Sequence, residues 1–520
     1  MTFYTVTVNP AGKSQTFPEG TLLADALLDM GIPLKTPCGG KGTCGHCRVP
    51  VTGIQADITP NEERALRGKH GYRLACQLPL IGDVEVSIDE TIREKQRYYP
   101  NLEGNRPYCL AVDIGTTNVR ISIVDPGSGS SYLLDSFLNP QRRFGHDVIS
   151  RISAAFQRGV PGKMQGLIRK SVFSSISQAL DAMDISSERV SCIAFSGNTT
   201  MLYLLLGNDV TPLGKYPYPV SAREFSALTV RDLGGSLIPE TPVYILPVLS
   251  AFLGGDLIGG LALCHTNGVR KNAFFIDLGT NAELFLIDRA GQVHATSCAM
   301  GPALEGINIT WGMTAEDGAI THVMQEPGGL FYEVMGGIRP SGISGTGLID
   351  LISLLLEKGI IEESGVFALP AGMNLPSPLD FGETDGVREL RIQDDITLTQ
   401  VDIRTVQLAK GASLAASELL LKEARCSTDD IENVFIAGAF GEHLDMEHFS
   451  RLGFIPEFKN AHSRFLGNTS LQAAQMTCRD ARFLENATRL RDRTRELVLA
   501  NHPGFQDTFI RALSFSSGIS

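Results

Sequence analysis

Two distant segments of the chain repeat one pattern of residues, and this repeat constrains the fold more than any other feature. The segments CLAVDIGTTNVRISIVD, from Cys109, and AFFIDLGTNAELFLID, from Ala273, each contain an apolar strand, an aspartate, a Gly-Thr turn and a second apolar strand. From Tyr108 onward, strands that end in Gly-rich turns alternate with helical stretches, which is typical of an α/β fold. The repeat therefore predicts a body of two similar lobes.

The two Gly-Thr turns have the chemistry of a polyphosphate site. Backbone amides and threonine hydroxyls can donate hydrogen bonds to phosphate oxygens, and the carboxylate at each strand end can hold a hydrated Mg2+ or orient a water. For either turn alone, an ordinary hairpin between strands is the alternative. Both turns together, with a third Gly-rich turn in VFIAGAFGEHL from Val434, favour an ATP site.

These three turns resemble the two phosphate motifs and the adenosine motif of the superfamily that includes actin, hexokinase, acetate kinase and heat-shock chaperones. The resemblance implies a duplicated, ribonuclease H-like α/β ATPase domain of two lobes, in which Asp113 and Asp277 are catalytic. SGISGTGLID, from Ser341, resembles a further turn on the adenine side. The resemblance assigns ATP and its Mg2+ to these binding residues: Gly115, Thr116, Thr117, Asn118, Gly279, Thr280, Asn281, Gly345, Gly347, Gly438 and Gly441.

The stretch from Pro242 to Cys264 is long and apolar and carries a single charge, at Asp256. A membrane span is the alternative to a buried segment, but prolines and two Gly pairs interrupt the stretch and basic flanks are missing. A carboxylate near the middle would also be costly in lipid. We therefore expect a buried strand that runs into a buried helix, with Asp256 as a third candidate catalytic residue.

Two further loops and six scattered cysteines complete the candidates in the body. FSGNTTM, from Phe195, and MGPALEGINI, from Met300, are expected either as buried turns or as loops at the nucleotide site. Glu305, in the second loop, is included among the cofactor-binding candidates. The six cysteines stand mostly in apolar surroundings and are interpreted as core thiols: Cys109, Cys192, Cys264, Cys298, Cys426 and Cys478.

Four cysteines near the N-terminus have the spacing of a metal site. Cys38, Cys44 and Cys47 share one Gly-rich loop, and Cys76 follows alone. An iron-sulfur cluster needs four converging thiolates, of which three come naturally from one loop. A structural zinc site is the alternative, although zinc modules usually pair two short Cys-x2-Cys knuckles. The spacing favours the cluster.

Residues 1–90 resemble the 2Fe-2S ferredoxins, which implies an α+β domain with the β-grasp fold and one-electron transfer. The polar segment that follows contains Pro and Gly, so we expect a linker over 91–107 and the ATP-binding body over 108–520. Four basic residues surround the cysteine loop: Lys35, Lys41, His46 and Arg48. This basic rim is either a solvated surface or a docking face for an acidic electron donor.

Composition limits the kinds of partner. The formal net charge of −12 argues against a general nucleic-acid binder, which would carry a basic face. The N-terminus has no basic segment followed by an apolar one, so a secretory signal is not expected and the protein should stay in the cytoplasm. We expect neither a nucleic-acid partner nor a membrane partner. The oligomeric state stays open, with a homodimer as the arrangement to test.

A ferredoxin domain on an ATPase-like body is more informative than either part. ATP helps electron transfer when the acceptor has a lower potential than the donor, since each ~59 mV uphill costs one electron about a factor of ten. A plant-type cluster lies near about −400 mV, so a lower acceptor would need a nucleotide-linked conformational step. The combination predicts a molecular activator.

The whole chain resembles the reductive activators of corrinoid-dependent enzymes. The motifs occur in one order: the cysteine loop, DIGTTN, SGNTTM, GGD, DLGTNAE, GPALEGINI, SGTGLID and AGAFG. The resemblance implies ATP-dependent transfer of one electron from a 2Fe-2S cluster to the cobalt(II) corrinoid protein of a methyltransferase system, and a low-potential donor of the ferredoxin or flavodoxin type. The body begins soon after the linker, which leaves little room for the extra middle domain that some relatives carry.

Two other functions stay open at this point. One is an ATP-dependent small-molecule kinase with an appended redox domain, which phosphorylation of a hydroxylated compound or a carboxylate would reveal. The other is an ATP-regulated chaperone of metalloprotein assembly, whose partner binding would survive loss of the cluster.

Overall fold

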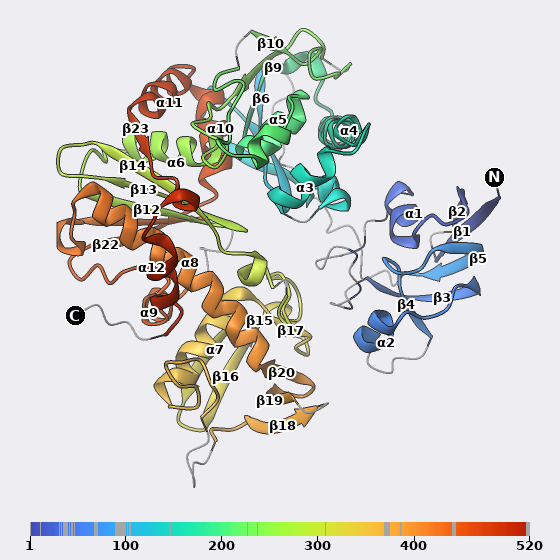
Figure 1. Cartoon of the computed structure of the whole chain (residues 1–520). Coiled ribbons are helices and arrows are strands. Elements are labelled where there is room, and N and C mark those ends of the chain that lie inside the picture. Colours follow the sequence, from blue (N-terminus) through green and yellow to red (C-terminus); the bar gives the residue numbers. More distant parts are fainter. Residues whose placement is uncertain are drawn as a thin grey trace. The chain divides into compact units, whose positions relative to one another are not determined.

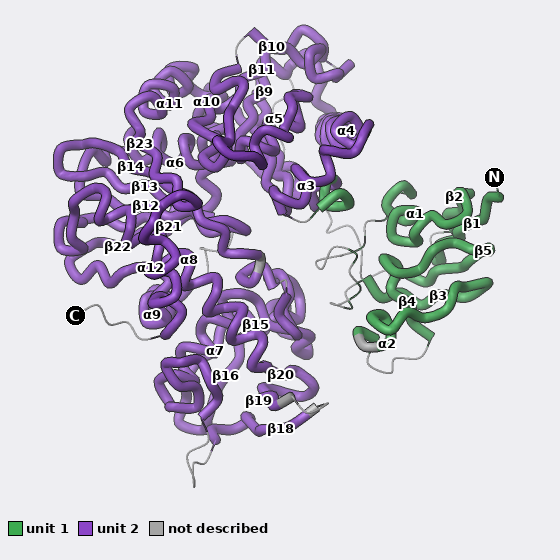
Figure 2. Tube along the Cα trace, viewed as in Figure 1, with its two compact units in different colours: residues 1–98, 141–146 green, residues 99–140, 147–520 purple. Residues whose placement is uncertain are grey.

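The structure of this chain is a computed structural model that divides into two compact units (Figures 1 and 2). One unit comprises residues 1–98 and 141–146, and the other comprises 99–140 and 147–520. The structure describes residues 2–10, 12–30, 32, 34, 40, 42, 45, 47–66, 71–88, 100, 102, 106–145, 147–225, 227–236, 238–306, 308–368, 375–384, 387–438 and 444–515.

The first unit contains a five-stranded sheet of order β2-β1-β5-β3-β4. β1 pairs in parallel with β5 and the other neighbours are antiparallel, so the implied β-grasp fold is confirmed. Leu23, Ala26 and Leu27 have helical spacing, and α1 buries all three in the core of this unit. The elements are β1 (Phe3–Asn9), β2 (Lys13–Pro18), α1 (Leu23–Asp29), β3 (Arg48–Gln55), α2 (Pro60–Leu66), β4 (Tyr72–Leu74) and β5 (Leu80–Ser87).

A buried ion pair joins α2 to β4 in the first unit. Arg73 Nε donates to Glu62 Oε1 at 2.8 Å, and Leu74 N donates to the same oxygen at 2.7 Å. Glu62 is fully buried and Arg73 nearly so, so each charge depends on the other for compensation. The pair stabilises the strand that leads to Cys76.

The first lobe of the second unit is built on a six-stranded sheet of order β10-β11-β9-β6-β7-β8. Its central strand β6 is buried along its whole length, as expected of a strand covered on both faces. β6 pairs antiparallel with β7 and in parallel with β9. The elements are β6 (Tyr108–Ile114), β7 (Asn118–Val124), β8 (Ser131–Leu138), α3 (Val148–Ala155), α4 (Val160–Ala182), β9 (Val190–Gly197), α5 (Thr199–Leu206), β10 (Leu228–Thr229), β11 (Pro242–Ile245) and α6 (Gly255–Thr266).

The second lobe repeats this arrangement in a sheet of order β22-β21-β12-β13-β14-β23. Its strand β12 pairs antiparallel with β13 and in parallel with β21, as β6 pairs with β7 and β9. Asp113 and Asp277 are the penultimate residues of β6 and β12. The predicted duplication is confirmed. The elements are β12 (Ala273–Leu278), β13 (Asn281–Ile287), β14 (Val293–Ala299), α8 (Gln400–Ala424), β21 (Asn433–Ala437), α9 (Met446–Arg451), β22 (His462–Gly467), α10 (Thr469–Arg479), α11 (Arg482–Arg493), β23 (Thr494–Glu496) and α12 (Phe505–Arg511).

An inserted region, yellow to orange in Figure 1, lies between β14 and α8 in the sequence. It contains two three-stranded sheets, of order β16-β15-β17 and β18-β19-β20. The inserted elements are β15 (Ala319–Glu326), β16 (Gly329–Val334), β17 (Gly342–Ile343), α7 (Gly345–Glu357), β18 (Asp380–Thr384), β19 (Val387–Gln393) and β20 (Ile396–Thr399).

Helices α6 and α10 connect the two lobes (Figure 1). α6 follows β11 of the first sheet, α10 follows β22 of the second, and the two helices pack against each other. α10 also contacts β6, β7 and β9 of the first sheet, and α6 contacts β13 of the second. Each lobe therefore supplies a helix that packs on the opposite sheet.

The apolar stretch from Pro242 to Cys264 forms β11 and most of α6, so the predicted buried strand and buried helix are confirmed. Across the part of the chain that the structure describes, no helix has both the length and the apolar character that a membrane crossing requires.

Candidate functional site

Each Gly-Thr turn is a tight connection between two antiparallel strands. Gly115 N donates to Asn118 O at 2.9 Å in the first turn, and Gly279 N donates to Asn281 O at 2.9 Å in the second. Both turns are therefore hairpins, and any phosphate chemistry depends on the groups that surround them.

Carboxylates from both lobes lie close enough to raise one another's pKa. Burial raises the pKa of Asp256 to about 6, and the negative charge of Asp113 adds to this effect. Burial also raises the pKa of Asp277 to about 7, with the charges of Asp256 and Asp113 as further causes. The pKa of Glu283 is raised well above its usual value, first by burial and then by the charges of Asp256 and Asp277. The three catalytic candidates therefore meet, together with Glu283, which the sequence analysis did not identify.

The first residues of α10 contact two of these carboxylates. Asn468 Nδ2 donates to Asp113 Oδ2 at 2.7 Å, and Ser470 Oγ donates to Asp113 Oδ1 at 2.7 Å. Thr469 Oγ1 donates to Asp277 Oδ2 at 3.4 Å. Burial raises the pKa of Asp113, while the hydrogen bonds from Asn468 and Ser470 oppose that shift. These contacts favour the ionised carboxylate and connect a strand of the first lobe to a helix of the second.

The sequence analysis missed Asn468 and Ser470, although a signal for them was present. Gly-Asn-Thr occurs twice, at 197–199 and at 467–469. Asn198 and Asn468 both cap the helix that follows, as acceptors of backbone hydrogen bonds. Asn198 Nδ2 also donates to Thr116 Oγ1 at 2.9 Å. The SGNTTM segment is therefore the junction between β9 and α5, and its Asn198 contacts the first Gly-Thr turn.

Glu305 bridges the two Gly-Thr turns. Thr117 Oγ1 donates to Glu305 Oε2 at 2.8 Å, and Thr280 Oγ1 donates to Glu305 Oε1 at 2.6 Å. One carboxylate thus accepts a hydroxyl from each lobe. Among the candidates from the sequence, Thr117, Thr280 and Glu305 come into direct contact.

Gly438 lies against the second turn. Its φ is +104°, and a Cβ at this position would lie 2.3 Å from Leu278 O and 3.0 Å from Asp277 Oδ1, so a side chain has no room there. Gly441 lies outside the described residues. Gly438 therefore joins the carboxylate cluster.

Gly345 and Gly347 begin α7, which contacts the short 3-10 helix that ends at Glu305. Ser344 caps α7 and accepts a hydrogen bond from Gly347 N at 3.3 Å. Both glycines are buried, so packing alone accounts for them, and their role at the adenine stays a prediction.

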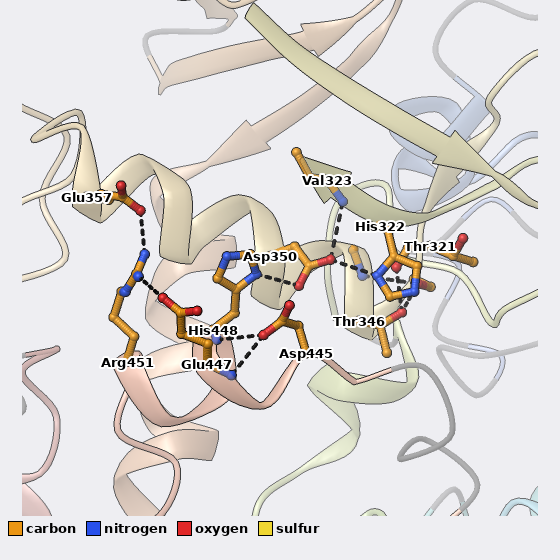
Figure 3. A network of polar contacts seen from close by, with 12 residues as sticks. Thr321, His322, Val323, Thr346, Asp350, Glu357, Asp445, Glu447, His448 and Arg451 are labelled. Atoms are coloured by element: carbon orange, nitrogen blue, oxygen red, sulfur yellow. Dashed lines mark hydrogen bonds and ion pairs between the residues drawn. The ribbon is translucent and has the colours of Figure 1, made fainter. Parts of the chain in front are cut away.

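A second polar network ties α7 to α9 (Figure 3). Asp350 of α7 pairs with His448 Nδ1 of α9 at 2.8 Å and with His322 Nδ1 of β15 at 3.0 Å. The hydrogen bond to Asp350 is the largest cause that raises the pKa of His448. Because α9 follows the AGAFG segment in the sequence, this network fixes the helix after that segment to α7.

In the first unit, the structure brings two of the four predicted cluster ligands together. Cys47 precedes β3 and Cys76 follows β4, and Ala75 N donates to Cys47 O at 3.0 Å. Both cysteines are buried. Cys38 and Cys44 lie outside the described residues, as do three of the four basic rim residues, and the fourth, Arg48, is exposed.

The described glycines of the cysteine loop have positive φ angles, a conformation that favours glycine. Gly40, Gly42 and Gly45 have φ values of +74°, +71° and +70°. The side-chain amide of Gln77 donates to Gly40 O and lies 3.9 Å from Cys76 Sγ. Gln77 therefore links Gly40, in the described part of the loop, to the neighbourhood of Cys76.

The fold and the site together define an ATPase of the actin and hexokinase type that carries a ferredoxin domain. Three family models match the chain. The 2Fe-2S iron-sulfur cluster binding domain matches residues 6–80, the RACo middle region matches 108–267, and the C-terminal domain of RACo, the ASKHA domain, matches 271–519. The chain belongs to the RACo family of reductive activators of corrinoid proteins. The matched middle region spans β6 to α6, which is the first lobe of the body, so the expectation of little room for an additional domain before the body stays a prediction.

Relatives of known description agree with this assignment. The chain is 31% identical over 437 residues to the corrinoid activation enzyme RamQ of Eubacterium limosum, covering 81% of this chain and 73% of the relative. It is 24% identical over 450 residues to the [Co(II) methylated amine-specific corrinoid protein] reductase of Methanosarcina barkeri, covering 78% and 77%. A solved structure, the reductive activator for corrinoid,iron-sulfur protein, aligns with a TM-score of 0.70 and 25% identity over 98% of both chains.

Proposed function

We propose that this chain uses ATP to drive one electron from its 2Fe-2S cluster onto the cobalt(II) corrinoid of a methyltransferase system, which restores cobalt(I). One observation carries the proposal. The chain joins a cluster-binding domain to a body in which two lobes converge on a shared carboxylate site. The relatives named as a corrinoid activation enzyme and as a corrinoid protein reductase support the choice of acceptor.

In the proposed nucleotide site, Asp113, Asp256 and Asp277 hold a hydrated Mg2+ and orient the attacking water. The chemistry of the donor set supports this role, because carboxylate oxygens are preferred Mg2+ ligands and a cation would relieve the repulsion that raises their pKa values. Glu305 positions the hydroxyls of Thr117 and Thr280 at the phosphates.

The remaining assignments at the nucleotide follow from the motifs. The backbone and side chains of the turns would contact phosphate, and the glycines after β17 and β21 would border the adenosine. The phosphate set is Gly115, Thr116, Asn118, Gly279 and Asn281. The adenosine set is Gly345, Gly347, Gly438 and Gly441.

The cluster ligands in this proposal are Cys38, Cys44, Cys47 and Cys76. When bound, the cluster supplies a one-electron carrier. The buried positions of Cys47 and Cys76 support the assignment, since thiolates of a cluster are held away from solvent by the domain core.

Nucleotide would act on the contact between the lobes. Asp113 belongs to the first lobe, and Asn468 and Ser470, which donate to it, belong to a helix of the second. A cation or phosphate at Asp113 would compete with these donors and change the position of α10 relative to the first sheet. This supports a conformational step driven by ATP rather than phosphorylation of a small molecule.

Three partners complete the proposal: the corrinoid protein, an acidic low-potential donor of the ferredoxin or flavodoxin type, and a second copy of the chain in a homodimer. The donor would dock on the basic rim that includes exposed Arg48. Charge reversal at Lys41 and Arg48 should slow reduction of the cluster and weaken its salt dependence.

Two variants with matched controls test the function. Asp277→Ala should keep the cluster but lose ATP turnover and cobalt(I) formation, while Asp429→Ala, at an exposed aspartate outside the motifs, should behave as wild type. Cys44→Ala should lose iron and electron transfer but still bind ATP, while Cys298→Ala should keep about two irons per chain. Cobalt(I) formation by Asp277→Ala at the wild-type rate would contradict the proposal.

A further inference from the structure

Three buried cysteines of the body, interpreted from the sequence as separate core thiols, converge in space. Cys109 lies near the start of β6, Cys192 in β9 and Cys478 in the last turn of α10. Their sulfur atoms all lie within 4.8 Å of one another. The parallel register of β6 and β9 sets Cys109 directly beside Cys192.

The surroundings of the three thiols are apolar and closed. The side chains are 3%, 7% and 8% exposed, and Ala111, Val124, Ala194, Leu471 and Ala474 pack around them. Ser191 Oγ lies 3.1 Å from Cys109 Sγ, and Cys478 Sγ donates to Leu110 O at 3.4 Å. The site thus offers three soft sulfur donors and one neutral hydroxyl.

Cys109 is the one thiol of the three that is favoured as a thiolate. Its pKa is lowered because the thiols of Cys192 and Cys478 donate hydrogen bonds to its sulfur. The hydrogen bonds with Cys109, together with burial, raise the pKa of Cys192 to about 12 and that of Cys478 well above its usual value, so these two stay thiols until a metal displaces their protons. A thiolate is the form of cysteine that binds metal.

We propose that Cys109, Cys192 and Cys478 form a site for one soft, thiophilic metal ion, and that this ion is monovalent copper. Thiolate ligands select soft cations such as Cu(I) and zinc. Structural zinc is almost always held by four ligands, and only three sulfurs converge among the described residues, so the donor set suits Cu(I) better. Binding forms three sulfur–copper bonds, releases the thiol protons to solvent and leaves the oxidation state of copper unchanged.

The position of this site links it to the nucleotide site. Helix α10 contacts the strands β6 and β9 at both ends of the strands. At one end the contact is made by the three cysteines, and at the other end it is made by Asp113, Ser196 and Ser470. Cys478 follows Ser470 by eight positions along α10, which corresponds to a rise of about 12 Å. The ion would therefore tie the interlobe helix to the first sheet and hold the donors to Asp113 in place.

Copper titration of the full-length, cluster-loaded protein tests the proposal. The protein is prepared without oxygen and titrated with Cu(I) against a colorimetric Cu(I) chelator, while the cluster absorption is followed. Wild type should take up one copper per chain without loss of iron. Cys192→Ser and Cys478→Ser should lower the affinity by more than about 100-fold, because each removes a ligand. Cys264→Ser, at a buried cysteine outside the three-thiol cluster, should bind as wild type.

Thermal unfolding gives a second readout that separates lost binding from lost folding. Cu(I) should raise the Tm of wild type and of Cys264→Ser, since a ligand of the native state stabilises it. It should leave the Tm of Cys192→Ser unchanged, although this variant keeps its cluster and its ATP binding. The proposal would be overturned if wild type took up no copper. It would also be overturned if Cys192→Ser and Cys478→Ser took up copper as wild type does.

Discussion

Removal of the Ser470 hydroxyl tests the electrostatics of the nucleotide site most sharply. Ser470 Oγ donates to Asp113 Oδ1 at 2.7 Å inside the body, and both residues are buried. A hydrogen bond to a charged group contributes about 1.5–3 kcal/mol, so Ser470→Ala should disfavour the ionised form of Asp113 by about that amount. At about 1.4 kcal/mol per factor of ten, the ionised fraction on the acid side should fall by about 10- to 150-fold.

The assay is kcat/KM for ATP hydrolysis measured across pH. Since the lost bond stabilised the carboxylate, the pKa of Asp113 should rise and the acid limb of the profile should move to higher pH. Ser413→Ala is the control, because Ser413 Oγ is buried in α8 and has no hydrogen-bond partner among the described residues. An acid limb that stays in place in Ser470→Ala would refute the role given to Asp113 and to the start of α10.

Three further predictions concern metal binding, the ferredoxin core and the second polar network. Affinity for ATP with Mg2+ should fall as the pH falls below 7, because the pKa of Asp277 is raised to about 7 and protons then compete with the metal. Calorimetric titration at several pH values measures this affinity, and an affinity that does not change with pH would contradict the prediction. Glu62→Ala should destabilise the ferredoxin unit by about 3–5 kcal/mol, because it leaves the charge of Arg73 buried without its carboxylate partner. Glu63→Ala, at an exposed residue, should have little effect. Denaturant unfolding, monitored by the absorbance of the cluster, measures both. Because the pKa of His448 is raised, its ion pair with Asp350 stabilises the fold fully below pH 6.5, and this stabilisation is lost as the pH rises through the raised pKa. The Tm of wild type, measured against pH, should show this loss, and the Tm of His448→Gln should not.

Much of the architecture could be predicted because local patterns carry it. The strand-turn-strand repeat predicted two lobes, since each copy contains a whole hairpin within one short segment. The apolar stretch with one charge predicted a buried helix that carries Asp256, since an unpaired carboxylate in such a segment is costly unless it serves a site. The cysteine loop predicted the ferredoxin domain, because three of its ligands are close in sequence.

The contacts that the sequence did not reveal all depend on which distant elements the topology brings together. Ser470 meets Asp113 only because α10 crosses from the second lobe onto the first sheet. Cys478 joins Cys109 and Cys192 for the same reason. Asp350 and His448 pair because α7 lies beside α9, and neither segment alone indicates an ion pair. Such pairs have no local periodicity, so the fold has to be known first.

Formation of cobalt(I) by the wild-type protein, with ATP as the only component varied, tests the central claim most directly. The anaerobic mixture contains the cluster-loaded protein, Mg2+, a low-potential reductant and a corrinoid protein in the cobalt(II) state, and the corrinoid spectrum is followed. We expect cobalt(I) to accumulate when ATP is added and little to form without it. Equal cobalt(I) formation with and without ATP would mean that the chain is a plain electron carrier, and the proposed ATP-driven activation would be wrong.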